Sequence, residues 1–267
     1  MKLKLQSLLI LSLLFFSCKE QEHSEKKTSF ENKGHELVYE MVQKVGNYSK
    51  LAEKKDVVYT YKYQTPDGKT DLSTEKYIFD GELSYGAYEQ HERTLPQYEG
   101  LIEQGYDGKA YWLRHKGNYI QDATSLQRVT FNRPTNFYWF TMFQKLLDPG
   151  LTYEYLGEKN IEDKNYEVVK ISFDSYNEKP TDIYQIYINK DTKLVDQFLF
   201  TVAEVGVVDQ PLLMKLEYEE IEGLLIPTQR IYKGSNWEAE VTNAPWIKVN
   251  WSNIQFNNGL SRSIFEK

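Results

Sequence analysis

Residues 56–88, DVVYTYKYQTPDGKTDLSTEKYIFDGELSYGAY, decide the fold class of this protein. Apolar and aromatic side chains alternate with polar ones in the first part, which is the period-two pattern of a strand with one buried face. The side chains that share one face of this strand are Val57, Tyr59, Tyr61 and Tyr63. Pro66-Asp67-Gly68 predicts a turn and Asp80-Gly81 a tight hairpin, so the stretch predicts three consecutive antiparallel strands.

The same alternation returns along most of the remaining chain. Turn sequences such as Glu162-Asp163-Lys164-Asn165 and Asn189-Lys190-Asp191 separate the segments. Further strands are expected at 106–114, 151–158, 165–173, 182–189, 195–205, 212–221, 224–233 and 239–256. About ten strands with short connections, and no regular alternation with helices, predict one large antiparallel sheet. No Pro- or Gly-rich linker divides residues 34–267, which we therefore expect to form one domain.

Two segments have the three- and four-residue spacing of helices. The first covers residues 37–51 and presents one apolar face. The second is expected to begin at Pro134, which suits the first turn of a helix, and to end at Asp148-Pro149-Gly150. Eight of the eleven residues at 137–147 are apolar, yet the segment is too short to span a bilayer. We therefore expect this helix to fill a concave surface or to lie on a lipid surface. A core helix that contacts no ligand is the alternative explanation of the same apolar pattern.

The N-terminus has the organisation of a secretory signal. Two lysines and an apolar run within residues 1–16 are followed by Ser17 and the only cysteine, Cys18. The sequence Leu14-Phe15-Phe16-Ser17-Cys18 resembles a bacterial lipobox, in which the signal peptide is removed before the cysteine and the cysteine is acylated. Residues 1–17 are therefore expected to be a signal peptide and Cys18 the lipidation site. An ordinary signal peptide with an incidental cysteine is the alternative, although Cys18 has no disulfide partner in the chain.

Residues 18–33, CKEQEHSEKKTSFENK, contain eight charged residues and are predicted to form a disordered, lipidated tether. Without residues 1–17, which hold two lysines and no acidic residue, the formal net charge changes from −7 to −9. An acidic protein of this kind repels nucleic acid and anionic headgroups, so we expect membrane attachment through acylated Cys18. The expected location is the outer membrane, on its periplasmic face rather than the cell surface. The sequence identifies no protein partner.

Three motifs, in this order along the chain, resemble the LolA/LolB-type lipoprotein-carrier superfamily. They are YDGKAYW at 106–112, YINKDTKLV at 187–195 and EGLLIPT at 222–228. Together with the helix before the first strand, they extend the resemblance over residues 34–257. The resemblance implies a mainly β (α+β) fold, a curved antiparallel half-barrel whose concave side is closed by helices. It also implies a cavity that holds a hydrophobic ligand, the acyl chains of a lipid or lipoprotein, and a role in lipoprotein or lipid handling.

Aromatic, aliphatic and Met side chains suit the lining of such a cavity, because they adapt to varied apolar shapes. The candidate lining residues are Tyr59, Tyr61, Tyr63, Tyr77 and Phe79 from early strands, Ile186, Ile188, Phe198, Phe200 and Met214 from later strands, and Trp139, Phe140 and Phe143 from the middle helix. Plain core packing is the alternative role for each of them. The soluble carrier of the superfamily has no lipid anchor, so Cys18 makes this chain more similar to the membrane-bound acceptor.

The sequence contains no recognisable catalytic motif. It has no nucleophile elbow, no phosphate-binding loop and no pair of histidines with metal-ligand spacing. We therefore expect a binding protein that is not an enzyme and has no cofactor or metal. Two other functions stay open: a structural or interaction lipoprotein with a filled barrel, and a surface glycan-binding lipoprotein that uses Trp237, Trp246 and Trp251. An enzyme with dispersed catalytic residues is the remaining alternative.

Overall fold

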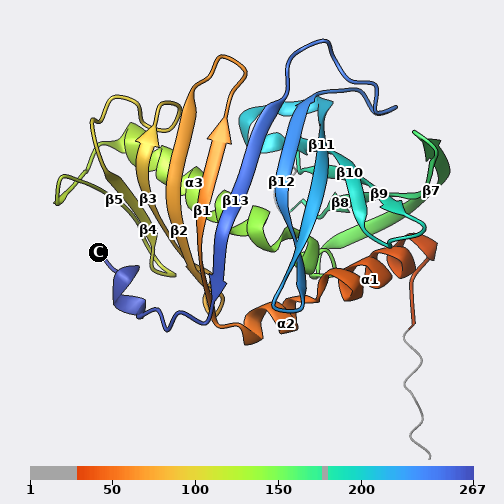
Figure 1. The fold of residues 1–267 in the computed structure, drawn as a ribbon, viewed down its shortest axis with the longest axis horizontal. Helices are drawn as coiled ribbons and strands as arrows, with labels where there is room; N and C mark the ends of the chain where they lie inside the picture. Colours follow the sequence, from red (N-terminus) through yellow and green to blue (C-terminus); the bar gives the residue numbers. More distant parts are fainter. Residues whose placement is uncertain (1–28, 176–179) are drawn as a thin grey trace, which may run out of the picture.

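The computed structural model describes residues 29–175 and 180–267. The expected signal peptide, Cys18 and the first part of the expected tether lie outside the described residues. Thirteen strands within the described part form one antiparallel sheet, which is open at both edges. The helices of the described part lie against this sheet and along its rim (Figure 1). The expected fold class, a mainly β protein with one large curved antiparallel sheet and few helices, is confirmed.

The strands form two meanders that meet at the centre of the sheet. The helices and 3-10 turns are α1 (Lys33–Val45), α2 (Tyr48–Glu53), α3 (Ala123–Thr141), η1 (Met142–Lys145), η2 (Ala203–Val205) and η3 (Arg262–Ile264). The strands are β1 (Asp56–Gln64), β2 (Thr70–Ile78), β3 (Leu83–His91), β4 (Ile102–Tyr106), β5 (Tyr111–His115), β6 (Asn118–Tyr119), β7 (Leu151–Ile161), β8 (Lys164–Phe173), β9 (Ile183–Asn189), β10 (Val195–Val202), β11 (Val207–Ile221), β12 (Leu224–Gly234) and β13 (Ile247–Phe256). Their spatial order is β6-β5-β4-β3-β2-β1-β13-β12-β11-β10-β9-β8-β7. The first and last strands, β1 and β13, therefore lie side by side at the centre (Figure 1).

Two strand predictions need correction. The strand expected at 106–114 is divided into β4 and β5, because the Asp107 carboxylate accepts hydrogen bonds from the backbone N–H of Lys109 and Ala110, both at 2.8 Å, and closes a turn. The strand expected to start at residue 239 starts at Ile247. The preceding residues form an excursion between β12 and β13 instead (Figure 1). The division at Asp107 and the short strand β6 add two strands to the eleven expected segments, which gives thirteen strands in the described part of the chain.

The first helical segment is two helices rather than one. Gly46 adopts φ +89°, a conformation that a side chain disfavours, and α1 ends there. Asn47 then caps α2, since its side chain accepts a hydrogen bond from the N–H of Lys50 at 3.0 Å. The apolar spacing was predicted correctly. The break at Gly46 changes the direction of the chain between α1 and α2, which both lie along the lower rim of the sheet (Figure 1).

The middle helix begins eleven residues before Pro134, the residue at which it was expected to start. Asp122 caps it by accepting a hydrogen bond from the N–H of Ser125 at 2.8 Å, and Pro134 lies inside the helix. The apolar pattern does not reveal this first half, because its inner face carries polar side chains such as Asn132 and Arg133. The helix ends at Thr141, and η1 continues the predicted apolar stretch.

Helix α3 runs across the concave side of the sheet (Figure 1). Its first half lies against β3, β4 and β5, where Val129 is fully buried. Its second half carries Phe137 and Phe140 into a cluster with the aromatic side chains of β1, β2 and β13. No helix in the described part of the chain is long and apolar enough to cross a bilayer.

A fully buried ion pair fixes α3 to the sheet. Arg133 Nη1 lies 2.8 Å from Glu75 Oε2 of β2, and neither side chain is exposed. The same guanidinium donates to the hydroxyl of Tyr88 at 2.9 Å, and Glu75 also accepts from the hydroxyl of Tyr77 at 3.0 Å. Gly86 of β3 leaves room for the guanidinium, since a Cβ there would lie 2.5 Å from Arg133 Nη1. Each charge thus has partners that offset its removal from water.

Arg133→Met should lower the free energy of unfolding by about 3–5 kcal/mol, because it leaves the Glu75 carboxylate buried without its counter-charge. Glu75→Gln should have a similar effect, and the double variant should cost less than the two single variants together. Urea titration at neutral pH measures all three values.

Arg262→Gln is the matched control, since it removes an exposed ion pair with Asp80 whose side chains are 54% and 91% exposed. It should cost less than about 1 kcal/mol. Equal losses at the buried and exposed pairs would contradict a structural role of Arg133.

Candidate functional site

A cavity of about 300 Å³ lies between α3 and the concave face of the sheet. Side chains of β1, α3, η2 and the four strands β10 to β13 line it. Most of these side chains are aromatic or aliphatic. Val205 of η2 belongs to the lining and is 57% exposed, so the cavity opens to solvent beside this turn. The volume lies at the lower end of the range for pockets that bind small molecules, roughly 300–1,000 Å³.

Six of the thirteen candidate residues lie in the wall of this cavity. They are Tyr59, Tyr61, Tyr63, Trp139, Phe200 and Met214. The three tyrosines have the same parity on β1, as the period-two alternation predicts, and Trp139 approaches them from α3. The Trp139 ring is 5.2 Å from the Phe200 ring between centroids, so helix and sheet meet at one side of the cavity.

The other seven candidates pack in the core beside the cavity. They are Tyr77, Phe79, Phe140, Phe143, Ile186, Ile188 and Phe198. Phe140 stacks on Tyr59 with ring centroids 4.9 Å apart, which closes the cavity on the side of β1 and β2. On the other side, α1 and η1 pack on the inner faces of β8, β9 and β10 and fill that half of the interior. The cavity therefore lies between two packed clusters.

The sequence analysis missed three arginines that line the cavity, Arg93, Arg128 and Arg230. Arg230 lies on the inner face of β12 and is only 2% exposed. Its inward direction follows from the period-two alternation of residues 224–232, so this arginine was visible in the sequence. Arg93 lies in the loop after β3, and Arg128 in the part of α3 before Pro134, where no pattern indicated an inward direction.

Arg230 is held by π systems and carbonyl groups rather than by a carboxylate. Its Cζ lies 3.8 Å from the centroid of the Trp251 ring. Nε donates to the carbonyl of Pro227 at 3.1 Å, and Nη2 donates to the carbonyl of Trp139 at 3.0 Å. Burial lowers the pKa of Arg230 to about 9, so the side chain is still a cation at neutral pH.

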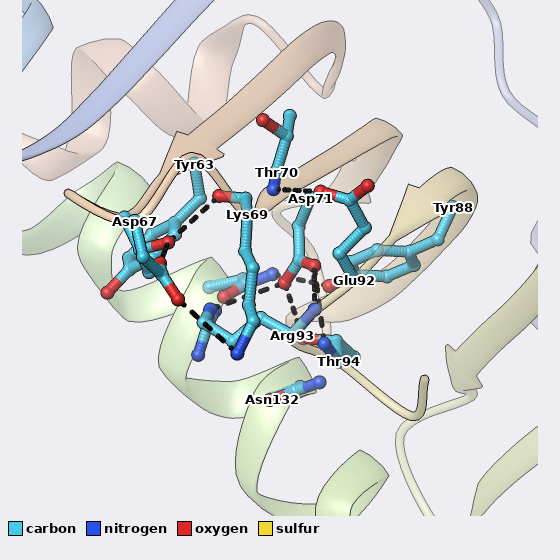
Figure 2. Close-up of polar contacts among 12 residues, drawn as sticks. Tyr63, Asp67, Lys69, Thr70, Asp71, Tyr88, Glu92, Arg93, Thr94 and Asn132 are labelled. Carbon is cyan, nitrogen blue, oxygen red and sulfur yellow. Dashed lines mark hydrogen bonds and ion pairs between the residues drawn. The ribbon is translucent and has the colours of Figure 1, made fainter. Parts of the chain in front are cut away.

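Arg93 lies over β1, with its Cζ 4.0 Å from the centroid of the Tyr63 ring. Its Nε is 3.4 Å from the Asp71 carboxylate, which also accepts a hydrogen bond from the Thr94 hydroxyl at 2.7 Å (Figure 2). Arg128 is half-buried and contacts no carboxylate among the described residues. Burial, and then the positive charge of Arg93, lower the pKa of Arg128.

The three tryptophans considered for glycan binding do not form one platform. Trp251 is 4% exposed and belongs to the interior, where it contacts Phe140 and Arg230. Trp237 and Trp246 are half-buried on the outer face, beside the side chains of β8 to β11. Their arrangement therefore differs from the open aromatic surface that the glycan hypothesis requires.

Within residues 29–175 and 180–267, no group of three His, Cys, Asp or Glu side chains has the geometry of a metal site. The two histidines near the end of β3 and β5 bond to backbone carbonyl groups instead. His91 Nε2 lies 2.7 Å from the carbonyl oxygen of Gly100, and His115 Nε2 lies 2.8 Å from that of Glu99.

Comparison with known proteins identifies relatives in fold. Residues 106–209 match a family of unknown function, DUF6503. No curated protein matches the chain. A DUF1329 family protein from Desulfovibrio piger is 17% identical, with 87% of this chain and 95% of that chain covered and a TM-score of 0.52. A putative outer membrane lipoprotein-sorting protein domain from Vibrio parahaemolyticus is 11% identical, with coverage of 88% and 96% and a TM-score of 0.51.

A LolA superfamily protein from Nitrosomonas europaea is also similar, at 14% identity, coverage of 86% and 97% and a TM-score of 0.47. The chain has a LolA-like fold, and the resemblance seen in its sequence motifs is confirmed at this level. All three motifs contain turns of the sheet, at Asp107-Gly108 between β4 and β5, at residues 190–194 between β9 and β10, and at Glu222-Gly223 between β11 and β12. They therefore identify the fold rather than the site.

The buried tyrosines predict how stability depends on alkaline pH. Burial raises the pKa of Tyr59, Tyr77 and Tyr184 well above 10 in the folded protein. The unfolded chain ionises its tyrosines near pH 10, so this contribution to stability is complete below about pH 10 and is lost as the pH rises further. Above about pH 10, each buried tyrosine lowers the free energy of unfolding by up to about 1.4 kcal/mol per pH unit.

Urea unfolding between pH 8 and 11 should show this decline, and Tyr59→Phe should flatten it by up to the contribution of one tyrosine. Tyr119→Phe, which changes an exposed ring, is the control. An unchanged slope in Tyr59→Phe would contradict the assigned burial of its hydroxyl.

Proposed function

We propose that this chain is a lipid-anchored envelope protein that binds a hydrophobic ligand, an acyl chain of a lipid or lipoprotein, between α3 and the sheet. The observation that carries the proposal is the apolar cavity of about 300 Å³ on the concave face. The LolA-like fold supports it, as does the structural similarity to the putative outer membrane lipoprotein-sorting protein domain from Vibrio parahaemolyticus. The proposed role is a binding role without catalysis, in the handling of lipids or lipoproteins.

The size of the cavity favours one acyl chain over several. A methylene group is similar in size to a water molecule, so this volume accommodates roughly ten of them at about 30 Å³ each. Burying ten methylene groups gives a gross stabilisation of about 8 kcal/mol. Ordering of the ligand reduces this value, and a dissociation constant in the micromolar range or weaker follows.

The wall of the cavity is suited to a flexible apolar guest. Tyr59, Trp139 and Phe200 present flat rings, and Met214 adds an unbranched side chain that adjusts to different shapes. The packed clusters on both sides hold these rings in place, so a ligand does not have to order the wall when it binds. In the alternative hypothesis, the protein's own side chains fill the barrel. This describes the half of the interior under α1, but not the region of the cavity.

Thr135→Trp should reduce retention of lipids at least tenfold, because Thr135 lies on α3 in the cavity lining and an indole there occupies the space of the ligand. Thr130→Trp makes the same change at an exposed position of the same helix and should bind like the unmodified chain. Native mass spectrometry of the full chain, after mixing with lipids extracted from bacterial envelopes, measures the adducts.

A chain without lipid adducts, under conditions that preserve a reference lipid-binding protein, would contradict the proposed function. Unchanged retention of lipids by Thr135→Trp would show that the adducts lie outside the cavity.

Cys18→Ser should move the protein from the membrane to the soluble fraction and abolish incorporation of radiolabelled palmitate, because the proposed anchor is the acylated thiol. Ser24→Ala, in the same tether, is the control. Continued membrane association of the serine variant would exclude acylation at Cys18 as the anchor.

A further inference from the structure

The cavity has an electrostatic character opposite to that of the whole protein. The chain carries a formal net charge of −7. The charged residues in the cavity lining are nevertheless all cationic, Arg93, Arg128 and Arg230, and no Asp or Glu belongs to the lining. The charge of the lining is therefore opposite in sign to the net charge of the chain.

Arg230 supplies the strongest observation, because it is a buried cation without an anion. Its side chain is 2% exposed, and its contacts are two carbonyl groups and the rings of Trp139 and Trp251. Within the described residues no group accepts a hydrogen bond from Nη1. Burial of a guanidinium without a carboxylate disfavours folding, unlike the paired burial of Arg133.

Arg93 and Arg128 form a second unbalanced feature. They lie close enough for the charge of Arg93 to lower the pKa of Arg128, and Asp71 is the only carboxylate in contact with either among the described residues. Asp71 is already occupied by the Thr94 hydroxyl and two backbone N–H groups. Asp71 contacts only Arg93, so two neighbouring cations with one engaged carboxylate leave guanidinium N–H groups for another anion.

Tyr61 contributes a hydroxyl to the cavity wall. It lines the same cavity as Arg93, Arg128 and Arg230, and its hydroxyl has no hydrogen-bond partner among the described residues. The cavity wall therefore combines hydrogen-bond donors with an apolar surface of aromatic and aliphatic side chains.

We propose that the ligand of this cavity is a single-chain amphiphile with an anionic head, whose carboxylate or phosphate oxygens bind Arg93, Arg128 and the Tyr61 hydroxyl while its chain lies along Trp139, Phe200 and Met214. This inference rests on the proposed function and narrows it, because a neutral lipid does not use the arginines. The guanidinium N–H groups match the planar or tetrahedral oxygens of such a head group. Arg230 adds a positive potential from the wall.

Isothermal titration calorimetry of the full chain with four probes tests the head group. Dodecanoate and dodecyl phosphate should bind at least about tenfold more tightly than dodecanol, which has the same chain and no charge. Inorganic phosphate, which has the charge and no chain, should bind at least about tenfold more weakly than dodecyl phosphate. A higher affinity for one of the two anionic amphiphiles assigns the head as carboxylate or phosphate.

Arg128→Gln should reduce the affinity for dodecanoate about tenfold and leave the affinity for dodecanol unchanged. Its melting temperature should be equal to or higher than that of the unmodified chain, because the variant relieves the repulsion with Arg93. Arg262→Gln removes an exposed positive charge of the same type and should change neither affinity.

The outcomes separate the two proposals. Equal affinity for dodecanoate and dodecanol would overturn the anionic head group and leave acyl-chain binding intact. Binding of none of the amphiphiles would overturn the proposed function itself. If inorganic phosphate bound as tightly as dodecyl phosphate, the cavity would be a site for small anions, and the proposal of an amphiphilic ligand would be overturned.

Discussion

The ion pair between Arg133 and Glu75 determines where α3 lies, and the interior is organised around that position. Both side chains are fully buried, so neither charge can leave its partner without a large penalty. The hydroxyls of Tyr77 and Tyr88 satisfy further positions of the pair, and Gly86 admits the guanidinium close to β3. The helix is therefore held at one separation from the sheet, and it cannot sink onto the concave face.

This fixed separation explains why one part of the interior is filled and another is hollow. Under β8, β9 and β10 the space is occupied by α1 and η1, and under β2 it is occupied by Phe137 and Phe140. Between these clusters a space of about 300 Å³ remains, and Tyr59 and Trp139 belong to its lining. The cavity opens to solvent beside η2, so it is a pocket and differs from a closed void left by imperfect packing of the core.

The sequence predicted the features that depend on local periodicity. Alternation on β1 predicted the inward face with Tyr59, Tyr61 and Tyr63, and the turn residues predicted most of the strand ends. It could not predict which inward residues reach the cavity, because Tyr59 and Tyr77 share the same pattern and differ only in what α3 places above them. It also missed the first half of α3, whose buried face uses polar groups that bind across the sheet rather than apolar groups. The period-two alternation of β12 indicates that Arg230 points inward. Only the three-dimensional structure shows that no carboxylate among the described residues pairs with it.

The two buried arginines of the interior illustrate opposite uses of one residue type. Arg133 is surrounded by a carboxylate and hydroxyls, so its burial contributes to a defined position of α3. Arg230 has a similar degree of burial and meets aromatic faces and carbonyl groups, none of which neutralises its charge. Folding physics alone would replace Arg230 by an apolar residue of similar length, since that change removes a desolvation penalty without breaking an ion pair. Local disagreement with the rest of a consistent fold is typical of a binding site, where the missing partner is a ligand rather than a side chain. The contrast between the two arginines therefore separates the part of the interior that holds the structure together from the part whose positive potential we propose attracts an anionic ligand.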